Sequence, residues 1–189
     1  MELKDLILKN RSYRRFFEDH EISLDILRGL VDLARLSPSG GNLQPLKYKL
    51  ANDAGTNQKI FPCLGWAGYL TNWPGPDEGE RPSAYILILE DTMIKKEVKN
   101  DQGIAAQSIL LGAAENGLGG CIIGSVKKER LREVLEIPAF LEILLVIALG
   151  KPKEVVVIES LPPDGNIKYW RDEAMVHHVP KRSLDEIII

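Results

Sequence analysis

Three apolar runs constrain the fold of this chain more than any other feature of its sequence. The run "AYILILE" (84–90) is almost continuously apolar, which is typical of a strand buried on both faces. "GCIIG" (120–124) and "FLEILLVIALG" (140–150) predict two further strands. Because helical patterns separate these runs, we expect an α+β domain in which helices surround a small central β-sheet.

The helical patterns lie before and between the apolar runs. A short helix is expected to end near Asn10, and a long helix over 94–116 should close at a C-cap glycine, Gly117. An amphipathic pattern predicts another helix over 127–137. Ser23 is a suitable N-cap for a helix whose buried face is formed by Leu27, Leu30, Val31 and Ala34.

The length and composition are those of an ordinary globular domain. The chain has 189 residues, of which 44% are hydrophobic and 27% charged, and it shows no repeat and no convincing linker. We therefore expect one domain over 1–189, in which the chain becomes irregular after "GKPKE" (150–154).

Charge and cysteine content narrow the classes of function. The net charge of −3 gives no basic field for nucleic acid or an acidic membrane surface, and no uncharged apolar run approaches the length of a transmembrane helix. The N-terminus lacks the features of a signal peptide, and the two cysteines form no CxxC motif. These features favour a cytoplasmic protein.

Two cationic clusters lie at opposite ends of the chain. "NRSYRRF" (10–16) combines three arginines with a serine, and "VPKRS" (179–183) adds a lysine and an arginine. Guanidinium and ammonium groups suit a phosphate, so the two clusters could converge on one dianion. The alternatives are a solvated basic helix end and a charged C-terminal tail.

The stretch "RLSPSGGNLQPLKY" (35–48) interrupts a helical pattern with an unusually polar loop. Proline and glycine provide turn signals, as in many loops. Short donors and acceptors are also dense in it, namely Ser37, Ser39, Asn42 and Gln44. The loop is therefore either solvated surface or shaped to hold a ligand.

The glycines of "ENGLGGCIIGS" (115–125) do not form a dinucleotide fingerprint. A helix precedes these glycines and a strand follows, which is the reverse of the order in that motif. The spacing also fails, because Ile122 stands at the third glycine position. Gly124, beside Ser125 at the far end of the strand, would instead allow a planar ligand to approach bare backbone.

No residue pattern predicts a metal site or a nucleophilic side chain. His177 and His178 should point to opposite faces of an extended segment, and only His20 could join them. Cys121 lies in a strand that we expect to be core. The aromatic residues of "FPCLGWAGYLTNWPGP" (61–76) fit either a lid over an aromatic ligand or an interface patch.

Taken in order, five motifs resemble the FMN-dependent nitroreductase family: "RSYRRF", "SPSGGNLQP", "GLGGCIIGS", "LLVIALGKP" and "PKRSLDEI". The resemblance covers nearly the whole chain and implies a nitroreductase-like fold in an intertwined homodimer with FMN at the subunit interface. It also implies that FMN takes hydride from NAD(P)H at N5 and reduces a nitroaromatic, a quinone or a similar acceptor by a ping-pong mechanism.

The resemblance also assigns site residues. It implies that one subunit binds FMN through Arg11, Ser12 and Arg14, with Arg14 as a possible stabiliser of charge at N1 and O2. The other subunit would contribute Pro38, Ser39, Gly40 and Asn42. The backbone N–H groups of Gly124 and Ser125 would face the N5 and O4 edge of the flavin, and Lys181 and Arg182 would bind the phosphate.

Some assignments stay open. Asn10 stands where many relatives have arginine, either Lys181 or Arg182 could hold the phosphate, and the segment 62–82 matches no family motif. Two alternative functions also remain. The first is a specialised flavoenzyme of the same fold, for dehalogenation, flavin fragmentation or dehydrogenation of a metabolite, and the second is a non-catalytic FMN-binding protein.

Overall fold

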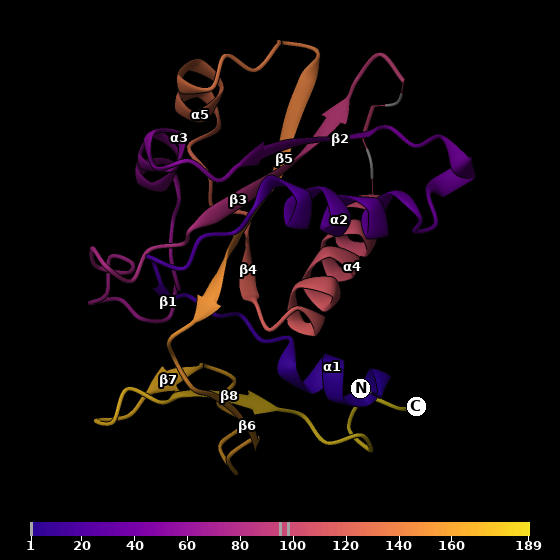
Figure 1. Cartoon of the computed structure of the whole chain (residues 1–189). Coiled ribbons are helices and arrows are strands. Elements are labelled where there is room, and N and C mark those ends of the chain that lie inside the picture. The colour runs from indigo at the N-terminus through magenta and orange to yellow at the C-terminus, as the bar shows by residue number, and fades with distance from the viewer. Residues whose placement is uncertain (1, 95, 98) are drawn as a thin grey trace.

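The computed structural model describes residues 2–94, 96–97 and 99–189 and confirms the α+β class. A central antiparallel sheet is enclosed by helices, and a second small sheet lies at the bottom of the view in Figure 1. The central sheet has the order β1 (Phe16–Phe17), β5 (Leu141–Pro152), β3 (Ala84–Asp91) and β2 (Leu46–Ala51), with β4 (Gly119–Ile123) also paired to β5. The helices are α1 (Leu3–Lys9), α2 (Leu24–Arg35), α3 (Ala54–Ile60), α4 (Asp101–Glu115) and α5 (Lys128–Val134).

The three strands expected from the apolar runs are confirmed as β3, β4 and β5. In β3 every residue from Ala84 to Glu90 is buried, because helices cover both faces of the sheet. Ile86 and Ile88 pack with α2 and α4 on one face, whereas Tyr85 and Leu87 join the cluster around α3 and α5 on the other. The continuous apolar run therefore follows from burial on two sides.

The first two predicted helices are confirmed. Helix α1 ends at Lys9, next to Asn10. Helix α2 begins after Ser23, whose hydroxyl accepts a hydrogen bond from the backbone N–H of Ile26 at 3.3 Å. The expected apolar face of α2 packs against α4, with Val31 partly buried and Leu27, Leu30 and Ala34 buried.

Two predicted helix boundaries are wrong. The helix expected over 94–116 is the shorter α4, although Gly117 follows it with a φ of 70° as expected for a C-cap. The φ of Glu97 is 63°, which a continuing right-handed helix does not allow. Positions 95 and 98 of that prediction lie outside the described residues. The helix expected over 127–137 ends at Val134, because Glu136 has a φ of 52°.

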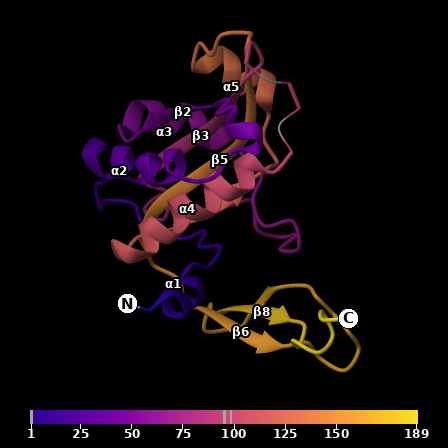
Figure 2. The same cartoon turned by 90° about the vertical axis from the view of Figure 1, so that its right-hand side faces the viewer.

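The expectation of an irregular chain after Glu154 is confirmed for residues 161–169 but is wrong for the segments on either side. Strand β6 (Val156–Ser160) runs parallel to β8 (His177–Lys181), and β7 (Trp170–Arg171) pairs antiparallel to the other edge of β8. Figure 2 shows this second sheet beside α1, below the central sheet. Sequence patterns also missed α3 and the edge strands β1 and β2. Among the described residues, no helix is long and apolar enough to cross a membrane.

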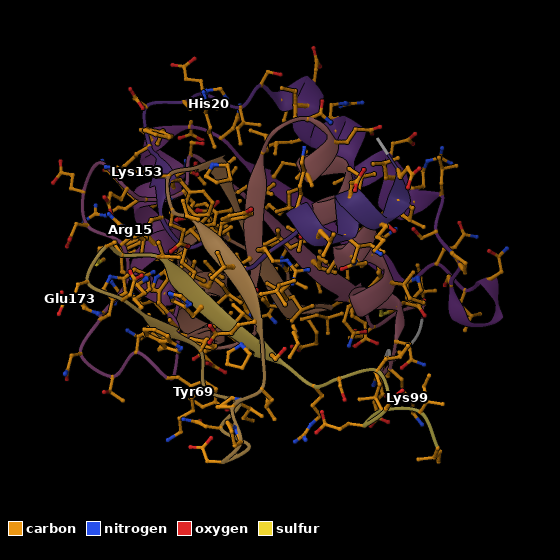
Figure 3. All side chains as sticks on the ribbon, turned by 90° about the horizontal axis from the view of Figure 1, so that it is seen from below. Arg15, His20, Tyr69, Lys99, Lys153 and Glu173 are labelled. Carbon is orange, nitrogen blue, oxygen red and sulfur yellow. The ribbon has the colours of Figure 1, made fainter. Side chains whose placement is uncertain are left out.

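A charge cluster ties the segment before β3 to the N-terminal link and to the end of β5. Glu80 accepts hydrogen bonds from Arg15 Nε at 2.5 Å and Nη2 at 2.7 Å, and its carboxylate also lies 2.9 Å from Lys153 Nζ. Arg15 and Lys153 lie on the same side of the molecule in Figure 3. The Arg15 guanidinium, which donates to the Glu80 carboxylate, lowers the pKa of Glu80 to about 2.

The cluster predicts a pH-dependent contribution to stability. Glu80→Gln should lower the free energy of unfolding by about 1.5–3 kcal/mol at pH 7, because two charge-assisted hydrogen bonds are weakened. The pKa of Glu80 is lowered on folding, so this stabilisation is complete above the ordinary value of 4.5 and is lost as the pH falls toward 2. Urea unfolding at pH 7 and pH 3 should show a smaller gap between variant and wild type at pH 3.

Glu78→Gln is the matched control, since Glu78 is exposed and makes no ion pair with a described residue. It should leave the unfolding free energy nearly unchanged at both pH values. An equal gap for Glu80→Gln at both pH values would contradict the assignment.

Candidate functional site

A cleft of about 300 Å³ brings the two ends of the chain together. Residues of the link after α1 form one side, and residues of β8 and of the turn before β7 form another. Helix α4 and strand β4 complete it. The lining residues are Asn10, Arg11, Ser12, Arg14, Gln107, Leu110, Ile122, Tyr169, His177, Val179 and Lys181. The two cationic clusters seen in the sequence therefore do meet in space, through Lys181.

Backbone contacts fix the link that carries the arginines. Ser12 forms a parallel bridge with Gly120, and the N–H of Tyr13 donates to the Gly120 carbonyl at 3.1 Å. The N–H of Arg14 donates to the carboxylate of Glu154, whose side chain is fully buried and also pairs with Arg171 at 3.0 Å. The link thus runs along the outer edge of β4 and is anchored to residues that follow β5.

The two guanidinium groups at the cleft keep unused donors. Arg11 Nη2 donates to the carbonyl of Ile7 at 2.7 Å, while its buried Nε has no partner among the described residues. Arg14 Nη1 donates to the Ser12 carbonyl at 3.2 Å, and the guanidinium lies 5.0 Å from the centre of the Tyr169 ring. Such contacts orient both cations and leave hydrogen-bond capacity for an anion.

His177 is a buried neutral base at the same cleft. It is 1% exposed, and its Nε2 lies 3.4 Å from Arg14 Nη1. Burial, supported by the charges of Arg14 and Arg171, lowers the pKa of His177 to about 4. The neutral ring can therefore accept a hydrogen bond from Arg14, which places the proton on Nδ1, a buried atom without a partner among the described residues.

The adjacent histidine has a different environment, as the alternation of a strand predicts. His178 lies between the carboxylates of Glu159 and Asp172, at 3.0 and 3.3 Å, and stacks on Trp170 with the ring centres 4.0 Å apart. Although partial burial opposes protonation, the two acidic partners raise the pKa of His178. The sequence pattern placed the two rings on opposite faces but did not reveal that His177 contacts Arg14.

Lys181 and Arg182 have separate environments. Lys181 ends β8 and lines the cleft, whereas the guanidinium of Arg182 lies 3.5 Å from Glu186 and outside it. Of the two cations that the sequence left open, only Lys181 lies with Arg11 and Arg14 in this chain.

The polar loop after α2 is held by one buried carboxylate. Asp101, 9% exposed, accepts hydrogen bonds from Ser39 Oγ at 2.6 Å and from the N–H of Gly40 at 3.1 Å. Asn42 and Gln44 have φ angles of 54° and 52°, so the loop has a defined and uncommon backbone conformation. None of its described residues, Pro38 included, lines the cleft of the same chain.

The far end of β4 is exposed and locally constrained. Gly124 and Ser125 follow the strand, and the Ser125 carbonyl accepts a hydrogen bond from the N–H of Gly65 at 2.7 Å. A Cβ at position 65 would lie 2.5 Å from Ser125 Oγ and 3.0 Å from Ser125 Cβ, so a larger residue there would require Ser125 to shift. Neither Gly124 nor Ser125 is a lining residue of the cleft, but Ile122 of the same strand is.

The aromatic segment before β3 packs against the second sheet. The ring centres of Tyr69 and Tyr169 are 4.9 Å apart, and the N–H of Tyr69 donates to the Tyr169 hydroxyl at 3.3 Å. Arg171 lies over the ring of Trp73 at 4.2 Å. Since Tyr169 lines the cleft, this segment supports one of its walls from behind.

The residues at the cleft fit an anionic ligand with a planar part. Arg11, Arg14 and Lys181 provide positive charge and several donors, including the unpartnered Arg11 Nε, and Ser12 adds a hydroxyl. This set suits a phosphate. Tyr169 and Ile122 add apolar surface, as expected where a flat ring system is bound.

Comparison with known proteins identifies the class to which this fold and cleft belong. The model of the Nitroreductase family matches residues 7–66 and 83–151, more than half of the chain. The chain therefore belongs to the nitroreductase family. The matched ranges include the arginine-containing link, the polar loop and the end of β4, but not the segment 67–82 or Lys181.

Two curated relatives are similar over most of their length. A protein of Archaeoglobus fulgidus, provisionally named NADH dehydrogenase/NAD(P)H nitroreductase, is 29% identical over an alignment of 161 residues, with 81% of this chain and 87% of the relative covered. The NADH dehydrogenase of Thermus thermophilus is 24% identical over 199 residues, covering 90% of this chain and 97% of the relative. These relatives support an oxidoreductase.

Solved structures show the same fold. A nitroreductase family protein of Streptococcus pneumoniae has a TM-score of 0.71 at 18% identity, with 100% of this chain and 99% of the other covered. An FMN-dependent nitroreductase of Clostridium difficile has a TM-score of 0.65 at 23% identity, with 80% and 88% covered. The nitroreductase-like fold expected from the sequence motifs is confirmed.

The environment of His177 predicts its titration. In NMR spectra recorded from pH 8 to pH 5, the imidazole signals of His177 should stay those of a neutral ring, because burial and two nearby guanidinium groups oppose protonation. His178 should protonate at a higher pH than an ordinary imidazole, since two carboxylates raise its pKa. His177→Gln assigns the signals, and a His177 midpoint near 6.5 would contradict this environment.

Proposed function

We propose that this nitroreductase-family protein is an FMN-dependent oxidoreductase that takes hydride from NAD(P)H and reduces a nitroaromatic, a quinone or a similar acceptor in a ping-pong cycle. The observation that carries the proposal is the convergence of Arg11, Ser12 and Arg14 with Lys181 on one cleft. The names of the relatives, which include NAD(P)H nitroreductase and FMN-dependent nitroreductase, support the choice of donor and cofactor.

The chain supplies binding groups and charge, whereas bound FMN would supply the hydride chemistry at N5. Arg11, Ser12 and Lys181 would hold the phosphate through charge-assisted hydrogen bonds. Arg14, oriented by His177 and by the ring of Tyr169, would place a fixed positive charge beside the ring system, which favours negative charge that develops there. Gly124 and Ser125 would offer backbone N–H groups to the N5 and O4 edge.

A second candidate is a specialised flavoenzyme of the same fold. The segment 67–82 lies outside the matched family ranges, and through Tyr69 it supports the wall that Tyr169 forms. The wall that Tyr169 forms is therefore built from residues outside the family-matched ranges. Such a wall would restrict which acceptors can enter the cleft, as expected of a specialised enzyme. A non-catalytic FMN-binding protein is the third possibility, and no contact among the described residues favours it.

The spectrum of the purified protein tests the function. It should show bound flavin, bleach on titration with NADH or NADPH, and regain its absorbance with nitroaromatics or quinones. Bleaching without reoxidation by any of these acceptors would favour the specialised enzyme, and flavin that NAD(P)H cannot reduce would favour the binding protein. A colourless protein that FMN cannot reconstitute would overturn all three.

Lys181 and Arg182 provide a matched pair of variants for the phosphate site. Lys181→Ala should weaken FMN binding about tenfold to a hundredfold, because a charge-assisted contact contributes roughly 1.5–3 kcal/mol. Arg182→Ala removes an adjacent cation outside the cleft and should change the affinity much less. Fluorescence titration of the apoprotein with FMN gives both constants, and the reverse order would reassign the contact to Arg182.

A homodimer with shared sites belongs to the same proposal. Ser39, Gly40 and Asn42 do not line the cleft of their own chain, which supports their contact with the ligand of a second copy. Apolar side chains are exposed around the loop and on the adjoining helices and C-terminus, namely Leu33, Leu36, Leu43, Ile104, Leu184, Ile187 and Ile188. Exposed apolar surface of this kind is typical of an interface, and an intertwined dimer would bury well over about 2,000 Å².

Subunit exchange between two inactive variants tests whether the sites are shared. Arg14→Ala and Asn42→Asp should each lose flavin binding and activity as homodimers. In a heterodimer, one site would receive both substitutions and the other neither, so mixing under exchange conditions should restore part of the activity. No recovery with proven heterodimers would mean that the loop serves its own subunit.

A further inference from the structure

The polar loop over residues 38–44 has little apolar packing that could fix its shape. Residues 40–44 are all exposed, and even the side chain of Leu43 is 46% exposed. Asn42 and Gln44 have φ angles in the left-handed region, which residues other than glycine adopt only at a cost in free energy. Hydrogen bonds must therefore hold the loop in this conformation.

Asp101 makes these hydrogen bonds from outside the loop. Its Oδ2 accepts from Ser39 Oγ at 2.6 Å, and its Oδ1 accepts from the N–H of Gly40 at 3.1 Å. Ser39 Oγ in turn accepts from the N–H of Gln44 at 3.0 Å, so a chain of hydrogen bonds runs from the carboxylate across the loop. Among the described residues, no other side chain from outside positions 38–44 forms a hydrogen bond with the loop.

Helix α4 gives this carboxylate a fixed position. Asp101 is the first residue of α4 and is buried. Ala106 and Ile109 of the same helix are fully buried in the core that α2 and the central sheet share. Further along α4, Gln107 and Leu110 line the cleft. One packed helix therefore holds the polar loop at its start and forms part of the cleft of its own chain.

We propose that Asp101 is a positioning residue for flavin: its carboxylate holds the polar loop in the conformation that contacts the flavin of a second copy. The proposal rests on the FMN site and the shared dimer proposed above. It implies that Asp101 of one subunit sets the flavin affinity of the site in the other subunit. A loop that adopts the binding conformation only part of the time lowers the apparent affinity by that fraction.

Asp101→Asn tests the carboxylate with little change of shape. Ser39 Oγ and the Gly40 N–H both donate to Asp101, and an amide keeps one acceptor but turns an NH₂ group toward the second donor. FMN binding to the apoprotein should weaken about tenfold or more, as expected when hydrogen bonds to a charged group are lost. Unchanged FMN affinity in this variant would overturn the proposal.

Glu115→Gln is the matched control for the affinity measurement. Glu115 is an exposed carboxylate at the other end of α4, away from the polar loop and outside the cleft. Its replacement by the amide should leave the FMN affinity unchanged. An equal loss of affinity in both variants would mean that any carboxylate of α4 has this effect, and it would overturn the specific role of Asp101.

Hydrogen exchange of the flavin-free protein tests the loop independently of the proposed function. In Asp101→Asn, the amide hydrogens of Gly40 and Gln44 should exchange about tenfold faster or more, whereas those of β3 should keep their wild-type rates. Wild-type exchange rates in the loop would overturn the proposal. Faster exchange in β3 to the same degree would show a general loss of stability and would also overturn it.

Subunit exchange shows in which site the carboxylate acts. Mixing Asp101→Asn with Arg14→Ala should restore part of the flavin binding, because one site of the heterodimer keeps its own arginine and receives an intact loop. Mixing Asp101→Asn with Asn42→Asp should restore nothing, because both loops are then altered. The reverse pattern would place the effect in the subunit's own site. That pattern, which a merely structural defect could also produce, would overturn the proposal.

The pair Arg14→Ala and Asn42→Asp separates a failure of this proposal from a failure of the proposed function. If that pair recovers flavin binding but Asp101→Asn with Arg14→Ala does not, the sites are shared and only the role of Asp101 is overturned. If neither pair recovers with proven heterodimers, the sites are not shared, and both proposals are overturned.

Discussion

The arrangement of the cleft in which the two ends of the chain meet depends on the buried carboxylate of Glu154. This group accepts the backbone N–H of Arg14 and pairs with Arg171, so it joins the N-terminal link to the second sheet directly after β5 ends. Removing one partner of a buried charge pair typically costs about 3–5 kcal/mol, because the remaining charge stays in a poorly solvated place. This contact therefore holds the two ends of the chain together beside the cleft, with help from the bridge between Ser12 and Gly120.

The central sheet gives that contact a fixed position. Strand β5 pairs with β1, β3 and β4, so its end is one of the most constrained points of the chain. Glu80 adds a second connection there, from Arg15 to Lys153. Arg14 and Arg15 are consecutive, and each is held by a different carboxylate. The cationic link is therefore rigid, and a rigid donor set binds an anion with a smaller loss of conformational entropy.

The sequence predicted those parts of the fold that local patterns determine. Strand β3 was predictable because both of its faces are buried, which makes its sequence continuously apolar. The start of α2 was predictable because Ser23 is an N-cap, and an N-cap is a local signal. Strand β2, "LKYKLA", alternates apolar residues with lysines, a period of two that is typical of a half-buried strand, so it was predictable although it was missed. Strand β6 depends on its pairing with β8 across a long intervening stretch. The residues of the cleft divide in the same way, into those marked by a local motif and those whose role depends on contacts between distant segments. The arginine motif was visible, whereas the role of His177 arises from contacts made only after folding.

The family-matched ranges and the remaining segments contribute differently to the cleft. The matched ranges provide the central sheet and Arg11, Ser12 and Arg14. Tyr169, His177 and Lys181 lie beyond them, in the part of the chain that is held in place by Glu154 and by contacts with Tyr69 and Trp73. The cleft is therefore built from both parts. The matched ranges supply Arg11 and Arg14, while the second sheet, with the segment packed against it, supplies Lys181 and the wall formed by Tyr169.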